Sequence, residues 1–225
     1  LYKPGYSIAY YNRGSAQYLI SQYNLAIADL NKALVLSPDN HFAYNNRGNS
    51  KYQMRDYQGA LFDYDKAISL SRNYLNPHEG RASANYRLGN YEQAKTDFSN
   101  AISIKPDNLK AFYNRGIIKS EHLKDISGAI FDLGQAIKID PNYHRSYNNR
   151  GNIRLKLGDY IGAINDFNDA ISIAPQYALA YYNRGIAKQE TGDMEGACSD
   201  YKISKSLSSL EVSNYIVSVI NSWCF

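Results

Sequence analysis

The sequence predicts an all-α fold made of six consecutive pairs of antiparallel helices. One observation is a five-residue pattern around an Asn-Arg-Gly core, such as "YYNRG" at Tyr10–Gly14, which returns every 34 residues, with one spacing of 35. A second is alanine at fixed distances behind this core, and a third is an apolar period near 3.6 residues. A constant period of this size indicates a repeat array in which each unit packs against its neighbours. The small residue that ends the core stands at Gly14, Gly48, Ala82, Gly116, Gly151 and Gly185.

The first unit shows the two helices that each repeat is expected to form. An apolar helical period covers about Ser7–Ile20, and a second amphipathic segment covers Tyr23–Leu36. The sequence "SPDN" then ends the second helix, because proline cannot extend the helix behind it. The expected units are 7–40, 41–74, 75–108, 109–143, 144–177 and 178–211, and the later prolines at this stop are Pro106, Pro141 and Pro175.

Three segments depart from the simple period. Unit four carries one extra residue between Gly116 and Ala129, for which we expect a local bulge in its first helix. Residues 1–6 are expected to be the tail of a preceding repeat or a linker. Residues 212–225 have apolar side chains at helical spacing and are expected to form a closing helix over the last repeat.

The period, the helix pair, the small positions and the closing proline together resemble the tetratricopeptide repeat (TPR) family over residues 7–211. The resemblance implies a right-handed α-solenoid, the TPR superhelix, and a non-catalytic scaffold for protein–protein interaction. Departures from the family pattern lie in units two and three, where Arg72 replaces the proline, His78 an aromatic residue and Ala82 the glycine.

Arginine and aspartate recur in matched positions of all six units. The arginine precedes the small residue, and the aspartate follows the first alanine of the second helix by three positions. Because both positions flank packing stripes, we expect a structural ion-pair ladder across the unit junctions, with bidentate pairs where geometry allows. The alternative is an arginine row that binds phosphate or carboxylate, but the matched aspartates would neutralise it. The predicted ladder consists of Arg13, Arg47, Arg81, Arg115, Arg150, Arg184, Asp29, Asp63, Asp97, Asp132, Asp166 and Asp200.

Asparagine precedes this arginine in five units, and Gly80 interrupts the row. In TPR proteins this stripe and the residue before it line the concave groove, so the resemblance implies a peptide-binding asparagine ladder, similar to that in the repeat superhelix of O-linked N-acetylglucosamine transferase. An amide side chain both donates and accepts, and can therefore hold the backbone of an extended peptide. The alternative is that these side chains merely face water. The predicted groove residues are Asn12, Asn46, Asn114, Asn149, Asn183, Tyr11, Asn45, Tyr113, Asn148, Tyr182, Lys110 and Arg145.

The carboxylate clamp of chaperone-binding TPR proteins is not expected. Lys110 and Arg145 occupy suitable positions beside Asn114 and Asn149, but Glu79 stands where the clamp needs a lysine.

The rest of the sequence argues against catalysis and against nucleic-acid or membrane partners. The net charge of +4 is dispersed, and no phosphate-binding glycine loop, HExxH or CxxC spacing occurs. We therefore expect no enzyme activity, no cofactor and no metal, and a protein or peptide as the partner.

Two alternatives stay open at this stage. The face of the first helix around Ala9, Arg13 and Ile20 could receive the end of another copy, so that chains assemble head-to-tail into a helical filament. Cys198 and Cys224 could form a disulfide, which would indicate an extracellular or periplasmic setting, or could remain free thiols in a reducing, cytoplasmic one.

Overall fold

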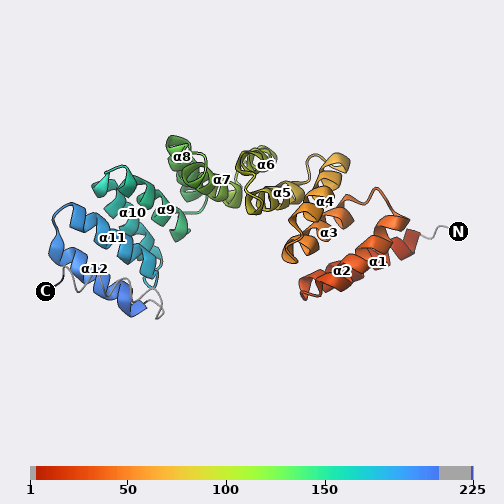
Figure 1. The fold of residues 1–225 in the computed structure, drawn as a ribbon, viewed down its shortest axis with the longest axis horizontal. Helices are drawn as coiled ribbons and strands as arrows, with labels where there is room; N and C mark the ends of the chain where they lie inside the picture. The colour runs from red at the N-terminus through yellow and green to blue at the C-terminus, as the bar shows by residue number, and fades with distance from the viewer. Residues whose placement is uncertain (1–3, 208–223, 225) are drawn as a thin grey trace. The chain divides into compact units, whose positions relative to one another are not determined.

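The computed structural model describes residues 4–207 and Cys224. Within these residues the chain forms twelve α-helices in consecutive antiparallel pairs, which confirms the predicted all-α repeat fold (Figure 1). The first helices of the six pairs are α1 (Pro4–Leu19), α3 (His41–Gln53), α5 (Leu75–Arg87), α7 (Leu109–Glu121), α9 (His144–Lys156) and α11 (Ala178–Glu190). The second helices are α2 (Tyr23–Leu36), α4 (Tyr57–Leu70), α6 (Tyr91–Ile104), α8 (Ile126–Ile139), α10 (Tyr160–Ile173) and α12 (Met194–Leu207).

The chain divides into two compact units, residues 1–111 and 112–225. In the first unit each helix from α1 to α6 contacts the next one along the chain, and the first helices also contact each other, α1 with α3 and α3 with α5. The second unit repeats this arrangement from α8 to α12, with α9 in contact with α11. First helices of neighbouring repeats therefore share an interface, and this interface positions the groove residues.

The turn between the two helices of a repeat is fixed by its backbone and by a capping side chain. A residue with positive φ ends the turn after the first helix, for example Gly158 at φ 78° and Gly192 at φ 85°. In four repeats an aspartate then caps the second helix, as when Asp159 Oδ1 accepts a hydrogen bond of 2.9 Å from the Gly162 N–H. The other three caps are Asp56, Asp125 and Asp193.

The core of each repeat is a small residue facing a large one. A side chain of α10, Phe167, is fully buried and lies over Gly151 of α9, where an added Cβ would come within 2.8 Å of the ring atom Cε1. Glycine is needed here because the two helices approach too closely for a larger residue. The alanines of the second helix, such as Ala163 and Ala170, are also fully buried.

Two expectations about the elements are wrong. Helix α1 begins at Pro4, so residues 4–6 belong to the first helix and not to a preceding tail; proline is tolerated at the first helical position because its missing N–H would have no intrahelical partner. The extra residue of unit four lies in the turn between Glu121 and Ile126, where Lys124 has φ 55°, and not in a helical bulge. A turn can absorb an insertion without breaking the hydrogen bonds of a helix. The predicted closing helix lies outside the described residues apart from Cys224.

Candidate functional site

The arginine of each first helix pairs with the aspartate of the second helix in the same repeat. In the fifth repeat, Arg150 donates to Asp166 through Nε at 3.0 Å and through Nη2 at 2.6 Å, and the Asp166 side chain is only 2% exposed. The predicted position of the pairs at the unit junctions is therefore wrong, since the two side chains face each other across one helix pair. The six pairs are Arg13–Asp29, Arg47–Asp63, Arg81–Asp97, Arg115–Asp132, Arg150–Asp166 and Arg184–Asp200.

The junctions are bridged by the remaining nitrogen of some arginines. Nη1 of Arg47 donates to Asn31 of the preceding repeat at 2.7 Å, and Nη1 of Arg184 donates to Asn168 at 2.7 Å. Arg81 makes the same contact with a carboxylate, that of Asp65, at 2.6 Å.

A second cation joins most of these pairs, and the sequence reasoning missed it. It stands four residues after the arginine on the same helix, so its charge meets the same carboxylate. Its Nζ or guanidinium lies 2.8–3.0 Å from the aspartate in Lys51–Asp63, Lys119–Asp132, Arg154–Asp166 and Lys188–Asp200. The third repeat has Asn85 in this position, and the first has Gln17.

The first residue of the five-residue pattern stacks on its arginine. The guanidinium carbon of Arg47 lies 5.3 Å from the ring centre of Tyr44, and that of Arg184 lies 5.4 Å from Tyr181. His78, which replaces the aromatic residue in the third repeat, is instead buried, with Nε2 2.9 Å from the Arg72 carbonyl oxygen.

Hydrogen bonding favours the charged state in three of these pairs. The bond to Asp166 is the main factor that raises the pKa of Arg150, and the bond to Asp200 does the same for Arg184. In the first repeat the bond from Arg13 lowers the pKa of Asp29. Hydrogen bonding therefore favours the charged forms of Arg150, Arg184 and Asp29.

Three of the predicted groove asparagines are buried between first helices. Asn45, Asn148 and Asn183 are 1%, 0% and 4% exposed. Asn183 donates to Asn148 Oδ1 at 3.1 Å, which joins α11 to α9. Since all three side chains are buried, the prediction that they contact a peptide is corrected.

The other predicted residues remain at least partly accessible. Asn46 donates to Ser15 Oγ at 2.8 Å and Asn149 donates to the Tyr113 hydroxyl at 2.8 Å, so both also brace neighbouring first helices. We call the accessible set the first-helix surface. It consists of Tyr11, Asn12, Asn46 and Lys110 in the first unit and Tyr113, Asn114, Arg145, Asn149 and Tyr182 in the second.

A polar cleft of about 260 Å³ lies in the first unit and shares Lys110 with the first-helix surface. One of its lining residues is Gly80, where the Tyr64 ring takes the space of a side chain: a Cβ on Gly80 would come within 2.5 Å of the ring atom Cζ. The Tyr64 hydroxyl donates to Asn49 Oδ1 at 2.8 Å. The cleft is lined by Tyr18, Asn49, Tyr52, Gln53, Tyr64, Asn76, Glu79, Gly80, Ser83 and Lys110.

Glu79 at the edge of this cleft is already paired. Its Oε2 lies 3.1 Å from Lys110 Nζ, and its Oε1 accepts a 2.7 Å hydrogen bond from Asn108. The charge of Lys110 is therefore partly neutralised by Glu79.

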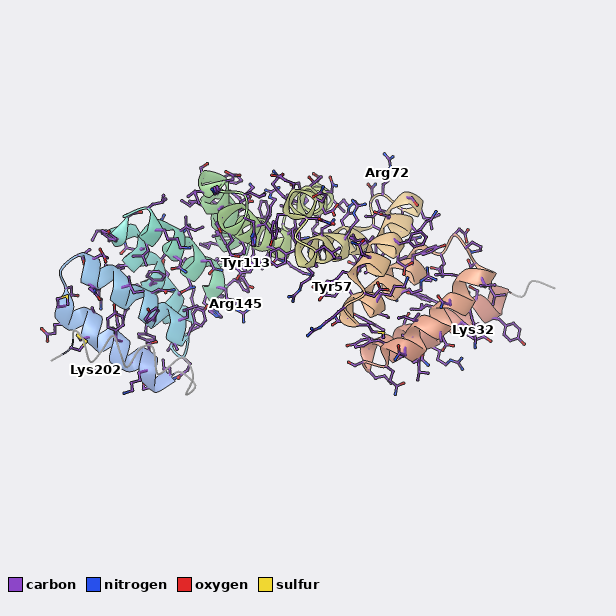
Figure 2. All side chains as sticks on the ribbon, viewed as in Figure 1. Lys32, Tyr57, Arg72, Tyr113, Arg145 and Lys202 are labelled. Atoms are coloured by element: carbon purple, nitrogen blue, oxygen red, sulfur yellow. A yellow bond between two sulfur atoms is a disulfide. The ribbon has the colours of Figure 1, made fainter. Side chains whose placement is uncertain are left out.

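A cation and several aromatic rings lie near one another in the second unit. Arg145 lies close to Tyr113 (Figure 2), and its charge acts on the pKa of both Tyr113 and Tyr177, lowering it, although burial raises the pKa of each tyrosine overall. Tyr143 makes an edge contact with Tyr113 at 5.2 Å, and His144 makes one with Tyr177 at 4.8 Å between ring centres. This part of the first-helix surface is suited to flat or anionic groups.

Cys198 of α12 and Cys224 are joined in the structure, with Cα atoms 5.4 Å apart. Cys224 also packs against the buried Ala197 and Tyr201, so the bond fixes the chain to the last helix pair.

Within the described residues, no group of three or more His, Cys, Asp or Glu side chains could hold a metal ion. None of the helices described here is both long enough and apolar enough to cross a membrane.

Family models match most of the chain. Models described as tetratricopeptide repeat match residues 7–40, 41–74 and 133–165, and one described as TPR repeat matches residues 82–121 and 151–192. The chain is a tetratricopeptide repeat protein. Among curated proteins, none matches it significantly.

Solved structures of other proteins share the fold. PilF of Pseudomonas aeruginosa is 18% identical with a TM-score of 0.77, over 95% of this TPR chain and 98% of its own. YrrB, a TPR protein with an unusual peptide-binding site, is 20% identical with a TM-score of 0.70, and the match covers 84% of this chain and 97% of YrrB. MamA of Desulfovibrio magneticus RS-1 is 16% identical with a TM-score of 0.70, and the match covers 76% of this chain and 96% of the MamA chain. At these identities the likeness extends to the fold alone.

Proposed function

We propose that this TPR protein is a non-catalytic scaffold that binds an extended peptide segment of a partner along the first helices of its first unit. TPR domains generally mediate protein interactions, and YrrB, of similar fold, has a peptide-binding site. The observation that carries the proposal is the cleft at Gly80, because four successive first helices, from α1 to α7, contribute side chains to it.

The chemistry of the surface supports an extended ligand. Gln53 offers donors and an acceptor to a peptide backbone, and the Ser83 hydroxyl, which donates to the Glu79 carbonyl oxygen at 2.9 Å, offers an acceptor. Tyr18 and Tyr52 add rigid flat walls. Each hydrogen bond contributes about 0.5–1.5 kcal/mol net, and ordering a peptide costs several kcal/mol. We therefore expect binding in about the micromolar range.

The test selects ligands from a display library of unstructured peptides and measures their affinity by fluorescence anisotropy. Gln53→Ala and Lys110→Ala should each weaken binding about 2- to 10-fold, the range for one lost hydrogen bond. Lys66→Ala, on the exposed face of α4, is the matched control and should leave affinity unchanged. The proposal is wrong if no peptide binds, or if the control weakens binding as much as the two cleft variants.

A further inference from the structure

A second cleft lies in the third repeat, among α4, α5 and α6, and contains none of the residues of the first-helix surface. Its volume is about 450 Å³. The polar groups that line it include Asp65, Arg81, Asn85, Glu92, Gln93 and Asp97.

The other repeats show what this position normally holds. In the second repeat, Lys51 Nζ lies 2.8 Å from Asp63 and 3.4 Å from the Gly59 carbonyl oxygen. In the sixth, Lys188 Nζ lies 3.0 Å from Asp200 and 3.4 Å from the Gly196 carbonyl oxygen. A carboxylate and a backbone carbonyl thus bind one ammonium group.

The fifth repeat makes the same pair of contacts with a guanidinium. Arg154 Nη1 lies 2.9 Å from Asp166 and 3.1 Å from the Gly162 carbonyl oxygen. The position therefore accepts either of the two basic side chains.

The third repeat keeps the binding groups and replaces the cation. Asp97 and Gln93 correspond in register to Asp63 and Gly59, and both line the cleft. Asn85 occupies the repeat position of Lys51, and its shorter, neutral side chain donates to Asp97 Oδ2 at 3.1 Å. The space that the longer lysine side chain would fill is open here as the cleft.

Charge at the third repeat is also more negative than in its counterparts. Arg81 is shared between Asp97 and Asp65, whereas Arg47 and Arg184 reach a neutral asparagine in place of Asp65. Glu92, at the rim, pairs with Lys95. The three carboxylates against two cations leave one net negative charge.

The geometry points to a binding site for a lysine or arginine side chain of a protein partner. This side chain would occupy in the third repeat the position that Lys51, Arg154 and Lys188 occupy in the second, fifth and sixth repeats. The incoming cation contacts Asp97 and Asp65 and the backbone carbonyl of Gln93. This site is independent of the proposed peptide groove, so either can fail without the other.

The test uses the capped tripeptide acetyl-Gly-Lys-Gly-amide as the probe and follows amide signals by NMR. We expect saturable shifts at Asn85, Gln93 and Thr96 and none at the counterpart Gly162. The same tripeptide with acetyl-lysine, which lacks the charge, should bind about two- to fivefold more weakly, the effect of one exposed ion pair.

Asn85→Lys supplies the decisive variant, because it installs the residue already found in three sister repeats and should fold normally. The inserted lysine should occupy the site and reduce the probe-induced shifts about fivefold or more. The inference is overturned if the probe shifts no cleft signal, if acetyl-lysine shifts them equally, if Asn85→Lys leaves them unchanged, or if Gly162 responds as strongly.

Discussion

Asp166 illustrates at the residue scale how the repeats depend on paired charges. Its side chain is 2% exposed and is bonded by Arg150 and Arg154. Removing the buried carboxylate leaves both cations without their partner, which is strongly destabilising. Replacing the carboxylate and its cations together by apolar residues would change the stability much less.

We therefore expect Asp166→Ala to lower the free energy of unfolding by about 3–5 kcal/mol. Asp169→Ala, an exposed position on the same helix, should change it by less than about 0.5 kcal/mol. Urea denaturation followed by circular dichroism measures both, and equal losses would refute the structural role of the pair.

His144 gives a second prediction, about pH. Burial and the charge of Arg145 hold its pKa below the usual value, so the unfolded chain takes up the proton first as pH falls. The contribution of neutral His144 to the free energy of unfolding is therefore fully present above about pH 6.5, the pKa of histidine in an unfolded chain. This contribution is lost as the pH falls from there towards the pKa of His144 in the folded state.

The variant His144→Phe keeps an aromatic ring against Tyr177 and removes this titration. The difference in stability between wild type and variant, measured by urea denaturation across pH 5 to 8, should shift in favour of the variant on acidification. A difference that stays constant across that range would contradict the assignment.

At the scale of the helix, the effect of a glycine depends on what its Cβ would meet. In α8, a Cβ on Gly134 would have Arg150 Nη1 at 3.7 Å as its nearest neighbour, an ordinary contact. In α11, a Cβ on Gly185 would come within 2.7 Å of the Tyr201 ring.

Gly134→Ala should raise the free energy of unfolding by about 0.5–1 kcal/mol, because alanine loses less backbone entropy than glycine when a helix forms. Gly185→Ala should lower it by about 1–3 kcal/mol through overpacking. Thermal denaturation of the two single variants measures both signs, and stabilisation by both would show that the close helix contact is not needed.

The order of the helices and most of their boundaries could be predicted from the sequence. The repeat period, the positions of the small residues and the residues typical of turns all indicate the same helix pairs. The predicted Tyr23–Leu36 is α2 as observed. The extra residue of unit four was misplaced because a periodic pattern shows that a residue was added but not whether helix or turn absorbs it.

The site was less predictable because accessibility depends on the neighbouring helix. Asn148 and Asn149 are adjacent and chemically identical, yet the first is buried against α11 and the second is half-exposed. The departures of the third repeat were visible at His78 and Gly80, but the cleft at Gly80 also depends on the Tyr64 ring, which comes from another helix.

For the molecule as a whole, the Cys198–Cys224 bond closes a loop of 26 residues onto the last pair. A bond of this span contributes about 3–4 kcal/mol to stability, and such bonds persist in oxidising compartments. Because each repeat contacts only its neighbours, the effect should stay local.

Replacing both cysteines by serine should speed amide hydrogen exchange in α11 and α12 and leave α1–α4 unchanged. Wild-type protein treated with reductant is the control and should behave as the double variant does. Uniform acceleration along the chain would show that the repeats unfold as one cooperative body.

Charge register argues against a head-to-tail filament of this chain. Asn31, Asp65 and Asn168 each accept a hydrogen bond from the arginine of the following repeat, and Lys202 holds that position on α12. In a second copy that continued the array, Lys202 would face Arg13, and the like charges would repel.

We therefore expect this chain to stay monomeric as its concentration rises, measured by light scattering with and without reductant. Lys202→Asp removes the repulsion and serves as the comparison. Rods formed by the wild type would overturn the charge argument and make self-assembly the better function.

The placement of each principal ion pair inside one helix pair also bears on how such a protein can change length. Excising residues 41–74 would remove Arg47, Lys51 and Asp63 together, and duplicating them would add all three. Recombination in whole blocks therefore keeps each principal arginine with its aspartate, and only the junction contacts, such as that between Arg81 and Asp65, have to be made again with the new neighbour.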